Sequence, residues 1–133
     1  MERKYMHRIE ELPKTPLVLE ENIYSRLLLG DNIQISFIEV PAGSVFPVHA
    51  HDCEQILIML EGTEEHVVDG VVYHMTAGDV CVHPAGVPHG GNGTSTGYKG
   101  IDIFSPPRDA HVEKMKEYGN MPDEFGYYKG ESK

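Results

Sequence analysis

The stretch Gly43-Ser-Val-Phe-Pro-Val-His49-Ala-His51-Asp-Cys-Glu-Gln55-Ile-Leu-Ile-Met-Leu-Glu-Gly62 decides the fold prediction for this chain of 133 residues. His49 and His51 stand two residues apart at the end of a strand-like run, and the period of two in a strand puts both side chains on one face. Two imidazoles that converge at this spacing can share a metal ion, each through a neutral nitrogen. The stretch therefore predicts a metal site carried on a β-strand.

Short runs of β type surround this stretch. They are Ser25–Leu29, Ile33–Val40, Val45–Ala50, Gln55–Leu60, His66–Val68, Val71–His74, Val80–His83 and Tyr98–Phe104. Asp69-Gly70 between two of the runs is a strong hairpin signal, and Glu61-Gly62 predicts another turn. Evenly spaced short strands with turns between them predict an all-β sandwich or barrel.

The two ends of the chain differ from its middle. We expect one domain, with a barrel core at about residues 23–105, a polar N-terminal arm at 1–22 and a helix and tail at 106–133. Pro13 and Pro16 break any helix in the arm. In the tail, Asp109 can cap a short helix that continues to about Tyr118 and stops at Gly119.

Charge and composition exclude several classes of protein. Lys+Arg number 11 against 21 Asp+Glu, a net charge of −10, so a nucleic-acid or anionic-membrane surface is not expected. No apolar run approaches the ~18 residues of a membrane helix, and the first residues lack the apolar core of a secretory signal. Cys53 and Cys81 form no disulfide framework. These features predict a cytoplasmic protein with reduced thiols. The eight histidines are the unusual feature of the composition.

A second stretch contains another histidine at an informative spacing. It reads Gly78-Asp-Val-Cys-Val-His-Pro84-Ala-Gly86-Val-Pro-His89. Together the two stretches resemble the paired sequence motifs of the cupins, in which glycines, proline and metal ligands recur at fixed offsets. The resemblance implies a double-stranded β-helix, or jelly-roll barrel, that binds one divalent transition metal such as Zn, Ni, Fe or Mn. It also implies four metal ligands, which are His49, His51, Gln55 and His89.

Two positions depart from the cupin pattern. Gln55 stands where many cupins have glutamate, and Asn92 falls one residue short of the asparagine that often ends the second motif. With three neutral imidazoles and a neutral amide, the charge of the ion stays uncompensated, so it is a stronger Lewis acid but is held less tightly. Glu54 is an alternative fourth ligand, although it is one residue out of register and points to the opposite face.

The remaining histidines and the nearby thiol match no ligand position. We expect these histidines at the surface or behind the ligands; they are His7, His66, His74, His83 and His111. Cys53 follows His51 by two residues, and we interpret it as a small buried thiol rather than a ligand.

The last predicted strand and the loop after it are the second informative region. Asp102 and Phe104 share one face, and Ile101 and Ile103 share the other. If the isoleucines face the lumen, Asp102 is a surface carboxylate; if they face outward, Asp102 and Phe104 enter the site. In the second case Arg108, beyond two prolines, can reach over the mouth and bind a substrate carboxylate in bidentate fashion, or it can pair at the surface.

The ending Asp-x-Phe-x-x-x-Arg, together with His-x-His-x-x-Glu-Gln, is similar to single-domain cupins called pectin-degradation proteins. These open 4,5-unsaturated uronate monosaccharides to 5-keto-4-deoxyuronate. The resemblance implies that Asp102 moves the proton, that Arg108 holds the substrate carboxylate and that Phe104 lies against the sugar. It also implies a homodimer. A cupin dioxygenase of the quercetinase or diketone-cleaving type and a non-catalytic binder of small molecules stay open, and the net negative charge counts slightly against an acidic sugar.

Overall fold

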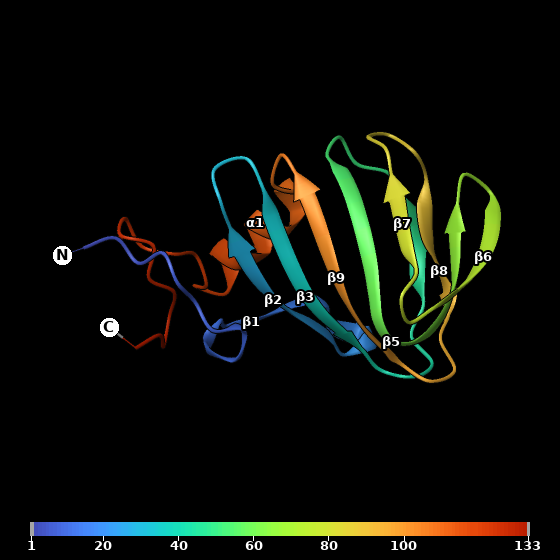
Figure 1. The fold of residues 1–133 in the computed structure, drawn as a ribbon, viewed down its shortest axis with the longest axis horizontal. Helices are drawn as coiled ribbons and strands as arrows, with labels where there is room; N and C mark the ends of the chain where they lie inside the picture. Colours follow the sequence, from blue (N-terminus) through green and yellow to red (C-terminus); the bar gives the residue numbers. More distant parts are fainter. Residues whose placement is uncertain (1, 133) are drawn as a thin grey trace.

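The structure, a computed structural model, describes residues 2–132, which form one curled antiparallel sheet with a short helix (Figure 1). Nine strands occur in this part of the chain. They are β1 (Lys14–Val18), β2 (Ile23–Leu29), β3 (Gln34–Val40), β4 (Phe46–His49), β5 (Glu54–Val68), β6 (Val71–Thr76), β7 (Val80–His83), β8 (His89–Gly93) and β9 (Tyr98–Ser105). Turns of 3-10 helix lie at Ile9–Glu11 and Leu19–Glu21, and the α-helix α1 spans Asp109–Glu117. The all-β prediction is confirmed.

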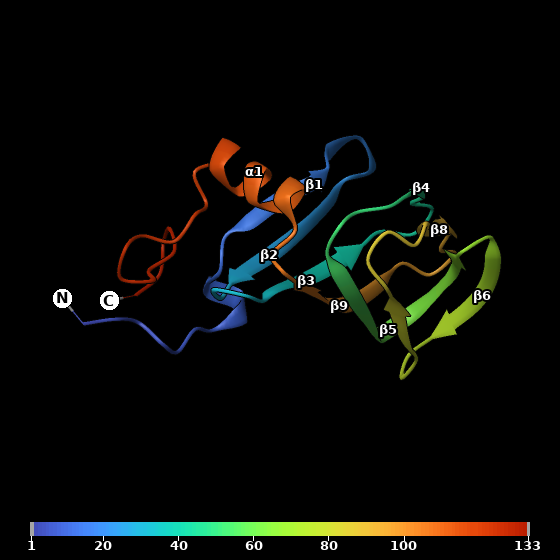
Figure 2. The ribbon, with the colours of Figure 1, turned by 90° about the horizontal axis from the view of Figure 1, so that it is seen from above.

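Strand β5 joins the two halves of the curled sheet. The hydrogen-bonded order is β1-β2-β3-β9-β5-β8-β4, and β6 and β7 also pair with β5. The first half of β5 lies between β9 and β7, and its second half lies between β6 and β8. This topology folds β4, β6 and β8 over one end of the sheet, as seen from above in Figure 2. The inner surface at that end is where the predicted ligands lie.

The predicted turn at Glu61-Gly62 is wrong, because β5 runs straight through it. The register against β9 shifts between Met59 and Glu61, and Gly62 has φ +85°. A Cβ at Gly62 would overlap the carbonyl of Gly97 and lie 2.9 Å from the Cα of Tyr98. The glycine therefore forms a bulge in a continuous strand. The predicted hairpin at Asp69-Gly70 is confirmed, with φ +50° and +80° at its two residues.

Two strands lie where no strand was expected. β1 falls within the predicted N-terminal arm and pairs with β2. β8 has the sequence His-Gly-Gly-Asn-Gly, which lacks the β-branched and aromatic residues typical of strands. Its glycines serve packing, since a Cβ at Gly90 would lie 2.8 Å from the carbonyl oxygen of Phe46. Close approach of β4 and β8 therefore overrides local propensity.

Every second residue along β2, β3 and β9 points inward, and these side chains fill the interior of the sheet. Fully buried side chains such as Ile23, Met59 and Leu27 lie on the inner face of the sheet in two clusters. Burying each such side chain contributes about 1.5–3 kcal/mol. α1 packs beside β1 through Met115, which is also fully buried. Asp109 opens this helix as predicted, but it is the first helical residue and no side-chain bond caps the helix.

The two ends of the chain lie together beyond the sheet (Figure 2). His7 bonds Glu131 at 2.7 Å, and the hydroxyl of Tyr128 accepts from the backbone N–H of Leu29 at 2.7 Å. Within residues 2–132, the structure contains no helix long and apolar enough to cross a membrane.

Candidate metal centre

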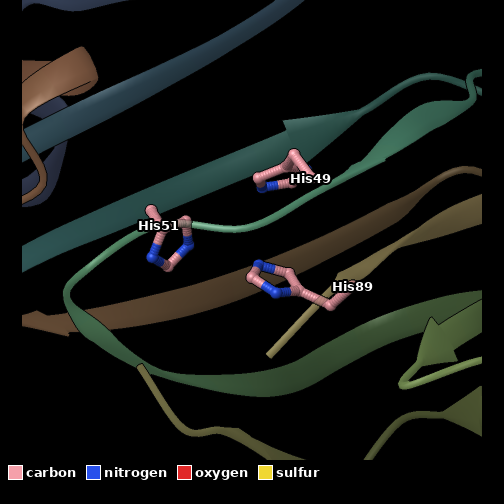
Figure 3. A group of neighbouring side chains, drawn as sticks. All are labelled: His49, His51 and His89. Carbon is pink, nitrogen blue, oxygen red and sulfur yellow. The ribbon is translucent and has the colours of Figure 1, made fainter. Parts of the chain in front are cut away.

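Three histidines from different segments converge inside the curled end of the sheet. His49 ends β4, His51 lies in the loop that leads to β5, and His89 begins β8. The antiparallel register of β4 and β8 places His49 directly across from His89. One ring nitrogen from each histidine lies within 4.8 Å of the others, and the rings face one another in Figure 3. The predicted grouping of His49, His51 and His89 is therefore present.

Backbone carbonyls fix the tautomer of all three rings. Each Nδ1 lies 2.9 Å from the carbonyl oxygen of a residue two positions away in the sequence. These oxygens belong to Pro47, Cys53 and Val87. Because a carbonyl oxygen only accepts, Nδ1 carries the proton and the neutral ring keeps its lone pair on Nε2. Burial lowers the pKa of His49, and it lowers that of His89 to about 4, so both are neutral at pH 7.

Gln55 contributes a fourth electron-pair donor to the same point. Its Oε1 lies 3.1 Å from His51 Nε2 and 3.0 Å from His89 Nε2, and its amide nitrogen donates to Asp102 Oδ1 at 2.7 Å. An amide oxygen facing two ring lone pairs has no proton to share, and the Nε2 of His49 is buried without a partner among the described residues. Three nitrogens and one oxygen with no hydrogen between them fit a bound transition-metal cation.

The alternative ligand Glu54 does not reach this point. It is exposed and pairs with Ser105 on the outer face of the sheet, whereas Gln55 is buried. Cys53 is the buried thiol that its position predicts, and its Sγ lies 3.2 Å from His51 Nδ1. Burial raises the pKa of this thiol, which keeps it protonated at pH 7.

Asp102 points inward, which decides between the two alternatives left open by the sequence. It is 8% exposed and stands opposite Leu57 of β5, while Ile101 and Ile103 face outward and are half-buried. Burial raises the pKa of Asp102 to about 6, and the hydrogen bond from Gln55 opposes that rise. A carboxylate with this pKa is ionised at pH 7 yet takes up a proton readily, as a general base must.

Arg108 and Phe104 lie next to the histidines. The guanidinium of Arg108 sits over the Phe104 ring with 5.7 Å from Cζ to the centroid, and its Nε is buried without a partner among the described residues. Phe104 is completely buried and meets the rings of His51 and His111 edge-on at 5.8 and 5.0 Å. The Phe104 ring is thus covered by His51, His111 and Arg108, and its contact with a substrate stays a prediction.

A hydrogen bond to the side chain of Gln34 holds the loop that carries Arg108. Gln34, fully buried in β3, accepts a hydrogen bond of 2.8 Å from the backbone N–H of Arg108. The amide nitrogen of Gln34 donates to His111 Nδ1 at 2.8 Å. Burial lowers the pKa of His111 well below its ordinary value, so the ring is neutral and accepts this bond. The position of Arg108 thus depends on side chains from β3 and α1.

A cavity of about 50 Å³ brings these groups together, and it includes residues that the sequence did not single out. Besides His49, Gln55, His89, Asp102 and Arg108, polar side chains line it from the second half of β5 and from β9 and α1. These are Glu64, His66, Tyr98 and His111. Of the five histidines without a ligand position, His66 and His111 line the cavity, His83 is buried behind it, and His7 and His74 bond acidic residues elsewhere.

The bulge at Gly62 explains why Glu64 and His66 were not predicted to face the site. Before it the odd-numbered residues Gln55 and Leu57 face inward, and after it the even-numbered Glu64 and His66 do. A simple alternation carried along β5 places them on the wrong face. A glycine within an otherwise strand-like run is the sequence signal that accompanies this change.

Comparisons with known proteins agree with this architecture. Residues 36–99 match the cupin domain family, a range that contains all four predicted ligands. A dimethylsulfoniopropionate lyase, DddQ, from Ruegeria pomeroyi is 33% identical over 61 residues, or 45% of this chain. The matched region spans only 30% of that lyase.

Solved structures extend the match beyond the sequence motif. An RmlC-like cupin from Shewanella frigidimarina superposes with a TM-score of 0.75 at 29% identity, covering 84% of this chain and all of that one. KdgF from Halomonas sp. superposes with a TM-score of 0.69 at 23% identity, covering 77% of this chain and 93% of that one. At that identity the second likeness concerns the fold alone.

Proposed function

We propose that this chain, which matches the cupin domain family over residues 36–99, is a metal-dependent enzyme that opens the ring of 4,5-unsaturated uronates to 5-keto-4-deoxyuronate. The observation that carries the proposal is one cavity that is lined by His49, Gln55 and His89 of the metal-binding donor set, by the Asp102 carboxylate and by Arg108. The motif similarity to pectin-degradation proteins supports the choice of substrate. A metal held by His49, His51, Gln55 and His89 would polarise oxygen atoms of the substrate as a Lewis acid.

Asp102 is suited to move the proton in this isomerisation. Its Oδ1 is held by Gln55, and the other carboxylate oxygen can take the proton of the C1 hydroxyl. The C1–O5 bond then breaks, C1 becomes a carbonyl, and the ring oxygen leaves as the enolate oxygen on C5. Return of the proton from Asp102 to C4 converts the enolate to the C5 ketone. Atoms and electrons balance without a co-reactant.

Arg108 is suited to bind the carboxylate of the sugar. Its buried Nε lacks a partner among the described residues, and a bidentate carboxylate would supply one. The cavity of about 50 Å³ admits only the reacting end of a monosaccharide. The rest of the ring would lie toward His49 and His51, which are partly exposed. Fixing the carboxylate would orient C1 and C4 toward Asp102, and orientation itself lowers the barrier.

The test is loss of the enol ultraviolet absorbance of unsaturated galacturonate, with the open-chain product identified by NMR. The metal-loaded protein should accelerate both, and the His49→Ala variant should not. Failure of the loaded protein to accelerate ring opening would contradict the proposal. Oxygen uptake with candidate flavonols or diketones would instead indicate a dioxygenase, and ligand binding without turnover would indicate a binder.

The sequence match to a dimethylsulfoniopropionate lyase favours a second candidate, an elimination on that substrate. Asp102 would take the proton next to the carboxylate, the C–S bond would break, and dimethyl sulfide and acrylate would form. Arg108 would hold the same carboxylate, and the net charge of −10 would not repel this substrate, because its sulfonium and carboxylate charges cancel. Gas chromatography of released dimethyl sulfide distinguishes this reaction from ring opening.

We also propose that the chain forms a homodimer through the outer face of the sheet. Two cross-strand rows of apolar side chains there form what we call the outer apolar patch. The rows are Ile35, Ile103, Ile56 and Val82, and Phe37, Ile101, Ile58 and Val80. An antiparallel sheet with one buried face normally carries polar residues on the other. A groove beside the patch is lined by charged side chains of both signs, which are Lys14, Arg26, Lys99, Glu39 and Glu61. A two-fold axis through the outer apolar patch would bury its two rows against the same rows of a second copy.

A further inference from the structure

A second cluster of potential metal ligands lies behind the first. His66, Cys81 and His83 each offer a ligand atom, and these atoms all lie within 4.8 Å of one another. Cys81 and His83 alternate along β7 and face inward, opposite Leu57 and Gln55 of β5. We propose that His66, Cys81 and His83 form a second metal site for a thiophilic cation such as Zn²⁺.

The hydrogen bonds of His66 resemble those of a metal-ligating histidine. Its Nδ1 donates to the Glu64 carboxylate at 2.7 Å, and both residues are buried. A carboxylate that holds one imidazole nitrogen orients the other toward a metal and increases its basicity. That other nitrogen, Nε2 of His66, points at His83. His66 therefore has the position and the hydrogen bond to a carboxylate that are typical of a metal-ligating histidine.

One ring nitrogen of His83 has no hydrogen-bond partner among the described residues. Its Nε2 lies 2.7 Å from His66 Nε2, so the two nitrogens share one proton. Since His66 accepts, His83 donates from Nε2 and its Nδ1 carries a lone pair. This Nδ1 is buried and has no hydrogen-bond partner among the described residues. When a cation binds between the two Nε2 atoms, the proton of His83 moves to its unpartnered Nδ1, so both rings stay neutral and each offers one Nε2 lone pair to the ion.

Cys81 adds the donor that selects the metal. It is a free thiol and partly exposed, whereas His66 and His83 are buried, so an ion would enter past the sulfur. A thiolate with two imidazoles favours Zn²⁺ or Cu⁺ over hard cations such as Mg²⁺. The charges also balance, because the Cys81 thiolate and the Glu64 carboxylate offset a divalent ion. The ligands of the first site are all neutral.

Binding requires the two imidazole nitrogens to move slightly apart. Ligand nitrogens about 2.0–2.1 Å from a tetrahedral zinc lie roughly 3.3 Å apart, about 0.6 Å more than the observed separation. His83 also stacks on His89 with 4.1 Å between ring centroids and 8° between planes. This stack places the second site directly beside the first, so both must be counted together in any metal analysis.

Cobalt and zinc titrations of the metal-free full chain test this proposal without any activity assay. We expect two equivalents of metal per chain and a thiolate-to-cobalt charge-transfer band in the near ultraviolet. Cys81→Ser should lose the band and bind one equivalent, and His66→Gln should do the same. Cys53→Ser, which removes the other thiol, should keep both the band and the second equivalent. His49→Ala should bind one equivalent and keep the band.

Two outcomes would overturn the second site. One is a single equivalent of metal in the unaltered chain with no charge-transfer band. The other is a band that survives Cys81→Ser and disappears in Cys53→Ser, since that would place the thiolate beside His51 instead. Because His49→Ala removes only the first site, failure of the proposed enzymatic function and failure of the second site are separable.

Discussion

The amide nitrogen of Gln55 donates a hydrogen bond of 2.7 Å to Oδ1 of Asp102, and this bond aims the amide oxygen at the histidine lone pairs. One side chain thus links the candidate metal centre to the candidate base. A glutamate in its place could not donate to an ionised Asp102. The glutamine at a position where many cupins have glutamate is therefore matched to the inward-facing aspartate.

Gln55→Glu should bind metal more tightly but lose at least about tenfold in kcat. The new carboxylate adds charge to the ligand set, while two carboxylates in contact cannot both stay ionised, so Asp102 loses its function as a base. A competition titration with a chelating dye and steady-state kinetics measure the two effects. Unchanged kcat would mean that the Gln55–Asp102 bond has no part in catalysis.

Asp102→Asn should lower kcat by about 10²–10⁴-fold and leave metal content unchanged, because an amide cannot accept the substrate proton and is not a ligand. Stopped-flow measurement of ring opening gives kcat, and elemental analysis gives the metal content. Asp31→Asn, at an exposed turn, is the matched control and should behave like the unaltered chain. Full activity in the Asp102 variant would assign the proton transfer to another group.

Arg108→Lys should raise KM by about tenfold or more with a smaller change in kcat, since lysine keeps the charge but cannot bind a carboxylate in bidentate fashion. Initial-rate kinetics over a range of substrate concentration provide both constants. Arg8→Lys, whose side chain is 75% exposed, is the control. An unchanged KM would place the substrate carboxylate elsewhere.

Gly62→Ala should destabilise the fold by more than about 2 kcal/mol, because the new methyl group overlaps the Gly97 backbone and φ is positive. Gly43→Ala is the comparison, since φ is +88° there but nothing lies within 4 Å of the added carbon. That variant should lose only about 1–2 kcal/mol. Urea unfolding measures both, and equal losses would contradict the role given to the bulge.

Ile56→Glu should convert the proposed dimer to a monomer, because the charge falls in the middle of the outer apolar patch. Light scattering after size-exclusion chromatography gives the mass of each species. Val71→Glu, on the exposed β5–β6 hairpin, should leave the dimer intact. If the unaltered chain is a monomer, the outer apolar patch is not a homodimer interface.

The sequence predicts the parts of the site that depend on local periodicity. Gln55 follows from strand alternation, and His49 and His51 follow from the motif spacing, although His51 lies in the loop beyond β4 and not on the strand predicted for it. The β4–β8 register then brings His89 to them. Alternation in β9 placed Asp102 on the same face as Phe104, but it did not say which face was inside. Pairing of β9 between β3 and β5 decides that, and it is a contact between segments far apart in the chain.

Other features depend on packing that a single sequence does not reveal. β8 was missed because glycines that pack well against β4 are poor strand formers in isolation. Glu64 and His66 were missed because the Gly62 bulge reverses the inward face of β5. In both cases a tertiary contact overrides the local pattern.

The most direct test of the central claim is the rate of ring opening of unsaturated galacturonate as metal is returned to the chelator-treated protein. The experiment is best done in the Cys81→Ser variant, in which the proposed second site is removed and one equivalent reports on the first. We predict no activity without metal and a rate that rises in proportion to occupancy until one equivalent is bound. Equal rates in the metal-free and loaded protein, or no ring opening at full occupancy, would contradict it.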